Sequence, residues 1–178
     1  MIQVRPITSA DTEAYFNLIS ANRQRLRDYF PVTLSKTETL EKTRECVDNY
    51  LELTATKELF VFLIMHGEQP IGVVILKEID HRSQKCEFAW LIDGTYEGKG
   101  YASQALQLVM AFVFNELKFN RVFCMVSVGN KPSIRLAERN GFEHEGILKE
   151  NFKMSDGSFS DVHHYGLLKS KWKIVKRL

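Results

Sequence analysis

The strongest pattern in the sequence is an amphipathic helix that begins directly after a glycine-rich loop. Apolar residues recur at the helical spacings i, i+3, i+4 and i+7 from Tyr101 to Leu117. Before this helix stand the loop Asp93-Gly-Thr-Tyr-Glu-Gly-Lys-Gly100 and the apolar stretch Cys86–Ile92, which is typical of a β-strand. Free N–H groups and the dipole at a helix start favour an anion, usually a phosphate. The segment therefore predicts an anion-binding loop, although two glycines are equally compatible with a simple tight turn.

Strands and helices are also predicted on both sides of this segment. The strand pattern occurs in Ile2–Ile7, Leu59–His66, Ile71–Leu76, Val122–Val128, Phe142–Leu148 and Phe159–Leu168. Helices are predicted around Tyr15–Ile19, with Ser9 and Asp11 as candidate caps, over Thr37–Glu58, with Ser35 and Thr37 as candidate caps, and over Pro132–Arg139. The strands Leu59–His66, Ile71–Leu76 and Cys86–Ile92 follow one another through short turns, so we expect them to be antiparallel.

Length and charge limit the classes of protein to which the chain can belong. Its 178 residues predict one domain, residues 1–178. A net charge of +2, from 24 basic and 22 acidic residues, predicts neither a nucleic-acid partner nor a membrane surface. The basic tail from Lys169 to Leu178 is expected to be solvated, although it could contact ribosomal RNA.

The cysteines and the chain start favour a soluble protein of the cytoplasm. Cys46, Cys86 and Cys124 are an odd number of cysteines spaced far apart, which is unlike a disulfide framework or a zinc site. The chain begins without an apolar leader, and no apolar run reaches about 18 residues, the length that a spanning helix needs.

Two common phosphate-binding motifs do not fit the loop. Three residues stand between Gly94 and Gly98, where a P-loop has four, and Gly100 takes the place of the P-loop Ser or Thr. A dinucleotide-binding motif needs G-x-G-x-x-G, but Gly98-x-Gly100 is followed by Ser103. A nucleotide hydrolase and a dinucleotide enzyme are therefore not expected.

The loop Glu97-Gly-Lys-Gly-Tyr-Ala102 resembles the pyrophosphate loop of the GCN5-related N-acetyltransferases (GNAT), although Glu97 replaces the Gln or Arg of the family pattern. The likeness to the ribosomal-protein (RimJ/RimL-like) branch covers nearly the whole chain. It includes Arg5-Pro-Ile, Asn22-Arg23 with Leu26, Glu87-Phe-Ala-Trp-Leu, Leu117-Lys-Phe-Asn-Arg-Val122, Asn130-Lys-Pro-Ser133, Asn140-Gly-Phe-Glu-His-Glu-Gly146, and Asp161 with Tyr165-Gly-Leu-Leu-Lys and Trp172.

The resemblance implies the α/β (α+β) acyl-CoA N-acyltransferase fold. In this fold a mixed, mostly antiparallel sheet of about seven strands is flanked by helices, in the order predicted above. The implied reaction is direct transfer of acetyl from acetyl-CoA to an amine in a ternary complex, without a metal. A homodimer or higher homo-oligomer is an open possibility.

The resemblance also implies which residues bind acetyl-CoA. Backbone amides of the loop would hold the pyrophosphate, an amide near Leu91 or Ile92 would polarise the thioester carbonyl, and Asn130 would bond the pantetheine. The expected cofactor-binding residues are Leu91, Ile92, Glu97, Gly98, Lys99, Gly100, Tyr101, Ala102, Ser103, Asn130 and Ser133.

Two side chains are candidates for proton transfer. Glu87 stands in an apolar strand, where burial would raise its pKa, and is the candidate base. It could instead point outward and pair with Lys85 or Arg82, while a water chain or Glu145 accepts the proton. Many relatives have a tyrosine as the acid at the position of Ala137, so the resemblance implies Ser133 instead. Asn130 and Ser133 could also be no more than the start of a helix.

Other reactive residue types are assigned to structure and not to chemistry. Cys124 lies in a buried strand, and direct transfer needs no acyl-enzyme. His163 and His164 are adjacent in a strand, so their side chains should face opposite sides and not share a metal ion.

Three functions remain open on the sequence alone. The leading one is acetylation of a protein amino terminus, with that of a ribosomal protein as the first candidate; the others are acetylation of a small amine (polyamine, amino acid or antibiotic) and non-catalytic acyl-CoA sensing. The acceptor pocket is expected between Asn22–Tyr29 and the hairpin Met154–Ser160.

Overall fold

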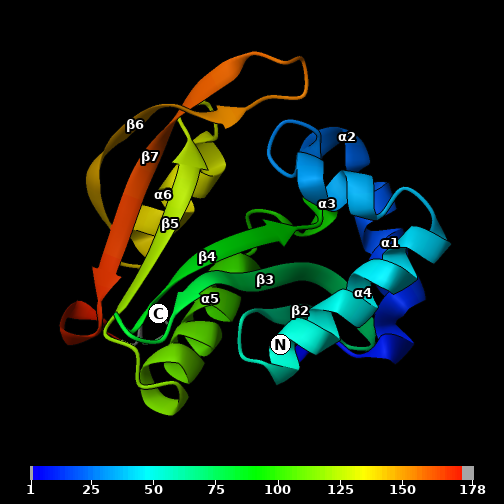
Figure 1. The fold of residues 1–178 in the computed structure, drawn as a ribbon, viewed down its shortest axis with the longest axis horizontal. Helices are drawn as coiled ribbons and strands as arrows, with labels where there is room; N and C mark the ends of the chain where they lie inside the picture. Colours follow the sequence, from blue (N-terminus) through cyan, green and yellow to red (C-terminus); the bar gives the residue numbers. More distant parts are fainter. Residues whose placement is uncertain (1, 174–178) are drawn as a thin grey trace.

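A single seven-stranded sheet organises the chain. The structure, a computed structural model, describes residues 2–173. The strands are β1 (Ile2–Pro6), β2 (Phe60–His66), β3 (Gln69–Asp80), β4 (Lys85–Ile92), β5 (Arg121–Ser127), β6 (Glu143–Lys153) and β7 (Phe159–Leu168). Their order across the sheet is β1-β2-β3-β4-β5-β7-β6, and every neighbouring pair is antiparallel except β4–β5 (Figure 1). The predicted mixed, mostly antiparallel sheet is confirmed.

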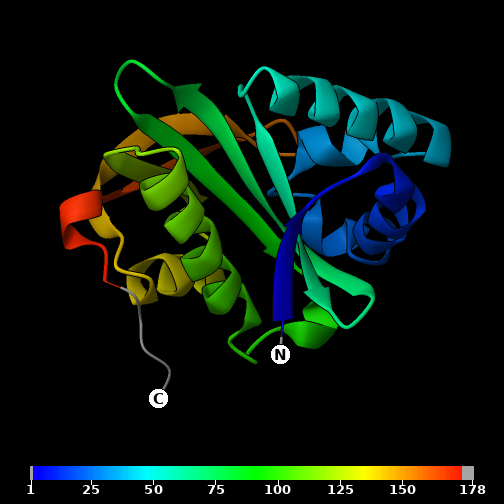
Figure 2. The same cartoon turned by 90° about the horizontal axis from the view of Figure 1, so that it is seen from below.

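Helices cover both faces of the sheet. They are α1 (Thr12–Ala21), α2 (Arg23–Leu26), α3 (Pro31–Lys36), α4 (Leu40–Ala55), α5 (Tyr101–Ala111) and α6 (Lys131–Arg139). Figure 2 shows α5 and α6 on one side of the sheet and α1 to α4 on the other. Each layer buries its own hydrophobic cluster, centred on residues such as Leu106 and Met110 on the α5 side and Ile19 and Val47 on the opposite side.

The parallel strands β4 and β5 separate soon after they meet. Their pairing is Lys85 with Arg121, Cys86 with Val122 and Glu87 with Phe123, and it ends there. Beyond this point β5 continues its pairing with β7, while β4 remains paired with β3. The sheet thus divides into two arms that diverge from Glu87 onward (Figure 1).

The predicted helix Tyr101–Leu117 is α-helical only as far as Ala111. A π-helical turn, Phe112–Glu116, follows, in which the N–H of Leu117 donates to the carbonyl of Phe112 at 3.1 Å. The wider turn places Phe112 edge-on against the rings of Phe60 and Phe62, while Phe114 packs on Trp172. Apolar periodicity cannot distinguish this turn from an α-helix because the residues remain buried in both.

Other boundaries also differ from the prediction. Thr39, and neither Ser35 nor Thr37, caps α4 by accepting the Lys42 N–H at 3.2 Å. The short helices α2 and α3 were not predicted, since four and six residues are too few to display a period. Strand β6 runs to Lys153, beyond the predicted Leu148.

The cysteines and part of the basic tail lie among the described residues. Within residues 2–173, no helix is long and apolar enough to cross a membrane. Cys46, Cys86 and Cys124 are buried and free. Of the basic tail, Lys169–Lys171 form a 3-10 helix, whereas Lys176 and Arg177 lie outside the described residues.

We expect Asp11→Asn to lower the free energy of unfolding by about 1–2 kcal/mol at neutral pH. The Asp11 carboxylate accepts two hydrogen bonds from Arg5, at 2.5 and 2.7 Å, and one from the Thr8 N–H at 2.8 Å. Arg5 lowers the pKa of Asp11 to about 2. A carboxylate with a lowered pKa stabilises the fold above its unfolded pKa of about 3.9 and loses this contribution as the pH falls through about 2. Urea unfolding at several pH values should therefore show the variant and wild type converging in acid; a constant difference would contradict this role.

Candidate active site

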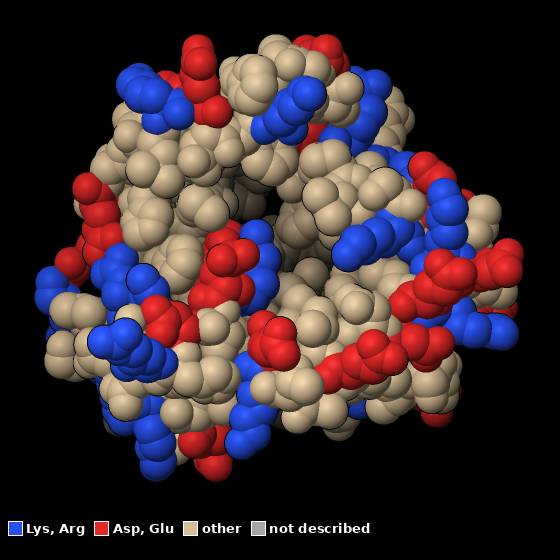
Figure 3. Space-filling model, in the orientation of Figure 1, with Lys and Arg blue, Asp and Glu red and all other residues tan. Residues whose placement is uncertain are grey.

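Two cavities meet where β4 and β5 diverge. The loop cavity, about 550 Å³, is bordered by the glycine-rich loop and α6, and the strand cavity, about 410 Å³, by β3 to β6 and α3. Figure 3 shows a hollow between the two halves of the molecule, with uncharged side chains around much of it and acidic and basic side chains at its lower left edge. Five residues line both cavities, namely Tyr29, Phe30, Trp90, Asn130 and Ser133. A molecule in one cavity can therefore reach a molecule in the other.

The glycine-rich loop opens the loop cavity toward the start of α5. Gly98 and Gly100 have φ angles of 73° and 76°, and Gly100 is the N-cap of α5. These left-handed conformations favour glycine, and the first N–H groups of a helix have no partner within the helix itself. The structure thus has the glycine loop at a helix start and beside a cavity, while anion binding by its amides stays a prediction.

Most residues expected at the cofactor line this cavity. They are Leu91, Ile92, Glu97, Gly98, Gly100, Tyr101, Ala102, Ser103, Asn130 and Ser133. Lys99 does not line it, because its ammonium turns back to the Thr95 carbonyl at 2.9 Å and lies over the Tyr96 ring. The Ser103 hydroxyl donates to Asn140 Oδ1 at 3.0 Å, and the backbone N–H of Ser103 belongs to the first turn of α5.

Arginines that the sequence analysis did not identify border the loop cavity. Arg25, Arg135 and Arg139 all contribute to its lining. Arg25 reaches the loop from α2, where it forms an ion pair with Glu97 and donates to Asn22 Oδ1 at 2.9 Å. Guanidinium groups suit phosphate ligands. Glu97 thus holds a guanidinium group at the loop, as one half of a net neutral ion pair.

Asn130 and Ser133 occupy the junction of the two cavities. Asn130 caps α6, and its Oδ1 accepts the Ser133 N–H at 3.2 Å. Asn130 and Ser133 therefore do form the start of a helix, and this helix start also fixes both residues at the junction. Beside them, the buried indole N–H of Trp90 has no hydrogen-bond partner among the described residues.

Glu87 lies in the strand cavity and not on the surface. Only 3% of the residue is exposed, and Oε1 lies 3.2 Å from Lys77 Nζ, while Oε2 has no partner among the described residues. The alternative of an outward carboxylate paired with Lys85 or Arg82 is thus wrong, because this β4 position faces inward and opposite Lys77 of β3. Burial raises the pKa of Glu87, although Lys77 opposes this effect.

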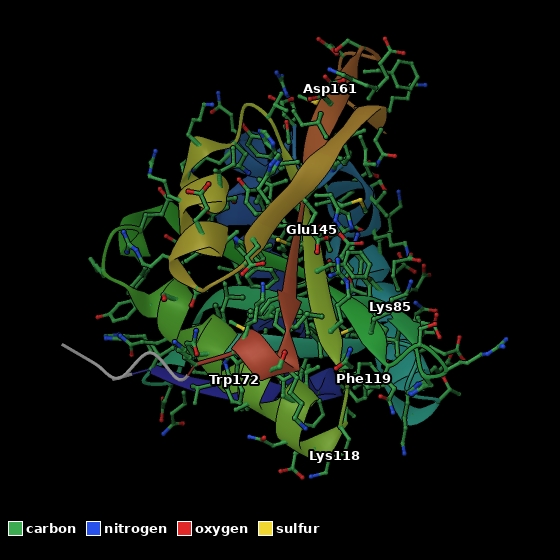
Figure 4. The ribbon with its side chains drawn as sticks, turned by 90° about the vertical axis from the view of Figure 1, so that its left-hand side faces the viewer. Lys85, Lys118, Phe119, Glu145, Asp161 and Trp172 are labelled. Atoms are coloured by element: carbon green, nitrogen blue, oxygen red, sulfur yellow. The ribbon has the colours of Figure 1, made fainter. Side chains whose placement is uncertain are left out.

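Glu145, the weaker candidate base, lies outside both cavities. It stands on the edge strand β6, as Figure 4 shows, where it forms an ion pair with Arg121 and contacts His164 Nδ1 at 3.0 Å. Arg121 lowers the pKa of Glu145, which makes it a poorer base. The two carboxylates thus differ in both position and basicity.

The adjacent histidines of β7 contact different neighbours. His163 Nδ1 lies 2.9 Å from His144 Nε2, whereas His164 contacts Glu145. Among residues 2–173, no group of three or more His, Cys, Asp or Glu side chains is arranged to hold a metal ion.

The presumed acceptor side is built by other residues than the sequence analysis expected. Tyr29 lines the strand cavity, but most of the expected stretch Asn22–Tyr29 does not; α3 and β6, through residues such as Val32 and Phe152, contribute instead. None of residues 154–160 of the expected hairpin lines either cavity, and the Ser155 hydroxyl donates to Asp28 at 2.7 Å. Contacts between segments so far apart in sequence leave no local pattern.

Comparison with known proteins identifies the family. Residues 2–143 match the acetyltransferase (GNAT) domain family. The chain is 31% identical over 157 residues to the probable N-acetyltransferase YjcK of Bacillus subtilis (strain 168), covering 86% of this chain and 87% of the relative. It is 28% identical over 174 residues to the putative ribosomal N-acetyltransferase YdaF of the same organism, covering 97% and 93%.

A solved structure agrees over the same extent. Spermidine N-acetyltransferase from Vibrio cholerae, in complex with CoA and spermine, superposes with a TM-score of 0.80 and 26% identity, covering 96% of each chain. The matched domain, the relatives and the shared sheet all lead to one assignment. The chain belongs to the GNAT acetyltransferase family and is an N-acetyltransferase.

Proposed function

We propose that this enzyme transfers acetyl from acetyl-CoA to the amino-terminal amine of a protein, with a ribosomal protein as the first candidate. The observation that carries the proposal is the meeting of the two cavities at Trp90, Asn130 and Ser133. One cavity suits a phosphate-bearing cofactor and the other an amine, so the reacting groups would meet in the gap between β4 and β5.

The loop cavity would hold the cofactor. Amides from Gly98 to Ser103 would bind its pyrophosphate, and Arg25 would add charge at the rim. The pantetheine would pass between β4 and β5 beside Asn130. An amide near Leu91 or Ile92 would polarise the thioester carbonyl and stabilise negative charge as it develops there.

Two side chains would manage the protons. The nitrogen of the neutral amine attacks the carbonyl carbon, and the carbon–sulfur bond then breaks. Before the attack, Glu87 would take a proton from the ammonium form of the amine, directly or through water. As the carbon–sulfur bond breaks, Ser133 would donate a proton to the departing thiolate and regain one from the nitrogen, which loses its second proton. Each group lines the cavity in which its proton transfer would occur.

The second candidate acceptor is a small amine. It is favoured by the solved spermidine N-acetyltransferase, whose fold covers 96% of this chain. The ribosomal candidate is favoured by the putative ribosomal N-acetyltransferase YdaF, which covers 97% of it. The fold is common to both, so the acceptor must be decided by the strand cavity.

Thiol release from acetyl-CoA tests the proposal. Peptides that begin with Ser, Ala or Thr should release thiol and gain one acetyl group at the amino terminus, as read by mass spectrometry. Peptides with a blocked amino terminus provide the control. Turnover of spermidine alone would favour the small-amine function, while acetyl-CoA binding without thiol release would indicate a sensor.

We expect Ser133→Ala to lower kcat by about tenfold or more. The change removes the proton donor but leaves the backbone N–H that Asn130 accepts. The Kd for acetyl-CoA, measured by calorimetry, should change little. Wild-type turnover in this variant would assign the leaving-group proton to water.

A further inference from the structure

The strand cavity has few charges for a site that accepts amines. Its walls are largely apolar and aromatic, with Phe30, Trp90 and Phe152 among them. Among the described residues that line it, Glu87 is the single carboxylate, and Lys77 is already paired with it. Lys36, an exposed residue of α3, also contributes to the lining. Two lysines thus stand against one acid within the lining.

Such a lining disfavours a second positive charge on the acceptor. A polyamine carries further ammonium groups, each of which loses hydration on entry and needs a carboxylate in exchange. Here the one carboxylate is engaged by Lys77, and Lys36 would repel the incoming charge. The aromatic rings could attract a cation, but they attract apolar groups without that desolvation cost.

The opening of the cavity has the same apolar character. Val32 lines the cavity although 65% of it is exposed, and Tyr29, also in the lining, is 36% exposed. Exposed apolar side chains at a cavity are typical of a surface that covers an apolar ligand. The charge distribution and the exposed residues therefore favour the same kind of acceptor.

We propose that the acceptor is a primary amine joined to an uncharged, apolar group, and that Lys36 acts against polyamines as a specificity residue. This proposal rests on the acetyltransferase function proposed above and narrows its acceptor. The amine belongs either to a polypeptide with an uncharged first residue, an apolar one being preferred, or to a free arylalkylamine. Both present one amine beside an apolar group that fits the strand cavity.

Relative kcat/KM values test the proposal. The acceptors are a peptide beginning with Phe, the same peptide beginning with Asp, 2-phenylethylamine and spermidine. We expect the Phe peptide or 2-phenylethylamine to exceed spermidine by about tenfold or more. Activity with the peptide alone identifies a polypeptide acceptor, and activity with both shows that the amine and its apolar group suffice. Equal or better turnover of spermidine would overturn the proposal.

Reversing the charge at Lys36 and at a control lysine separates the specific effect of Lys36 from a general effect of the protein's charge. Lys36→Glu should shift the preference toward spermidine by about threefold or more, because it gives the lining a second carboxylate. Lys169→Glu, an exposed lysine of the C-terminal 3-10 helix outside both cavities, is the matched control and should leave the preference unchanged. If Lys36→Glu left the preference between the two acceptors unchanged, Lys36 would have no role in acceptor specificity.

Equilibrium binding tests the preference of the strand cavity for apolar amines independently of the proposed acetyltransferase function. Calorimetry of 2-phenylethylamine and spermidine with the protein–CoA complex measures the preference without turnover. If no amine releases thiol, the proposed function fails, while tighter binding of 2-phenylethylamine still supports the cavity preference. Tighter binding of spermidine would refute the preference even in an active enzyme.

Discussion

Replacement of Gly100 by valine is expected to raise the Kd for acetyl-CoA by about tenfold or more. Gly100 has a φ of 76° and caps α5, at the point where the loop amides would face the pyrophosphate. An added Cβ would meet little, since the nearest atom, on Gln104, lies 4.0 Å away. The effect therefore comes from the left-handed backbone, which a β-branched residue resists and which it can relieve only by moving the amides.

Gly67→Val provides the matched control. Gly67 also has a positive φ, 62°, with open space around it, but it lies in the turn between β2 and β3 and lines neither cavity. Both variants should lose stability, which thermal unfolding measures, whereas only Gly100→Val should lose affinity in calorimetry. Unchanged affinity in folded Gly100→Val would contradict the assignment of the pyrophosphate to this loop.

Glu87→Gln is expected to slow acetyl transfer most strongly at pH values that lie between the pKa of Glu87 and the pKa of the amine. Burial raises the pKa of Glu87, so its carboxylate is a stronger base than an ordinary glutamate. An amino terminus has a pKa near 7.7–8.0, and above it the amine is neutral without help. The variant should therefore lose about a hundredfold below pH 7 and recover partly in alkali.

Glu145→Gln is the control for the loss of a carboxylate. Glu145 lies outside both cavities, so its variant should follow the wild-type pH profile. An acceptor with a pKa near that of lysine, about 10.4, should need Glu87 over a wider range of pH. If Glu87→Gln matched wild type at every pH with both kinds of acceptor, Glu87 would be a structural carboxylate.

Local sequence patterns predicted the elements that carry the chemistry. The glycine loop and the start of the helix at Tyr101 follow from spacing and residue type, whereas the sequence left both an inward and an outward position open for Glu87. The structure agrees with the first two because each depends on neighbours within a few residues. The order of the elements along the chain agreed with the family resemblance.

Contacts between distant segments were not predictable in this way. Lys77 pairs with Glu87 across two strands, and Arg25 joins Glu97 from a different helix. Helix α3, which lines the strand cavity, is only six residues long. The π-helical turn after Ala111 depends on rings contributed by β2 and the C-terminal segment. Such features arise from tertiary packing and leave no period in the sequence.

A crystal structure with bound coenzyme A tests the central claim most directly. The account predicts the pyrophosphate on the amides of Gly98 to Ser103 and the pantetheine between β4 and β5. The thiol should lie at the junction of the two cavities, within hydrogen-bond reach of the Ser133 hydroxyl. A coenzyme bound elsewhere, or one whose thiol stays outside the gap between the strands, would contradict the account.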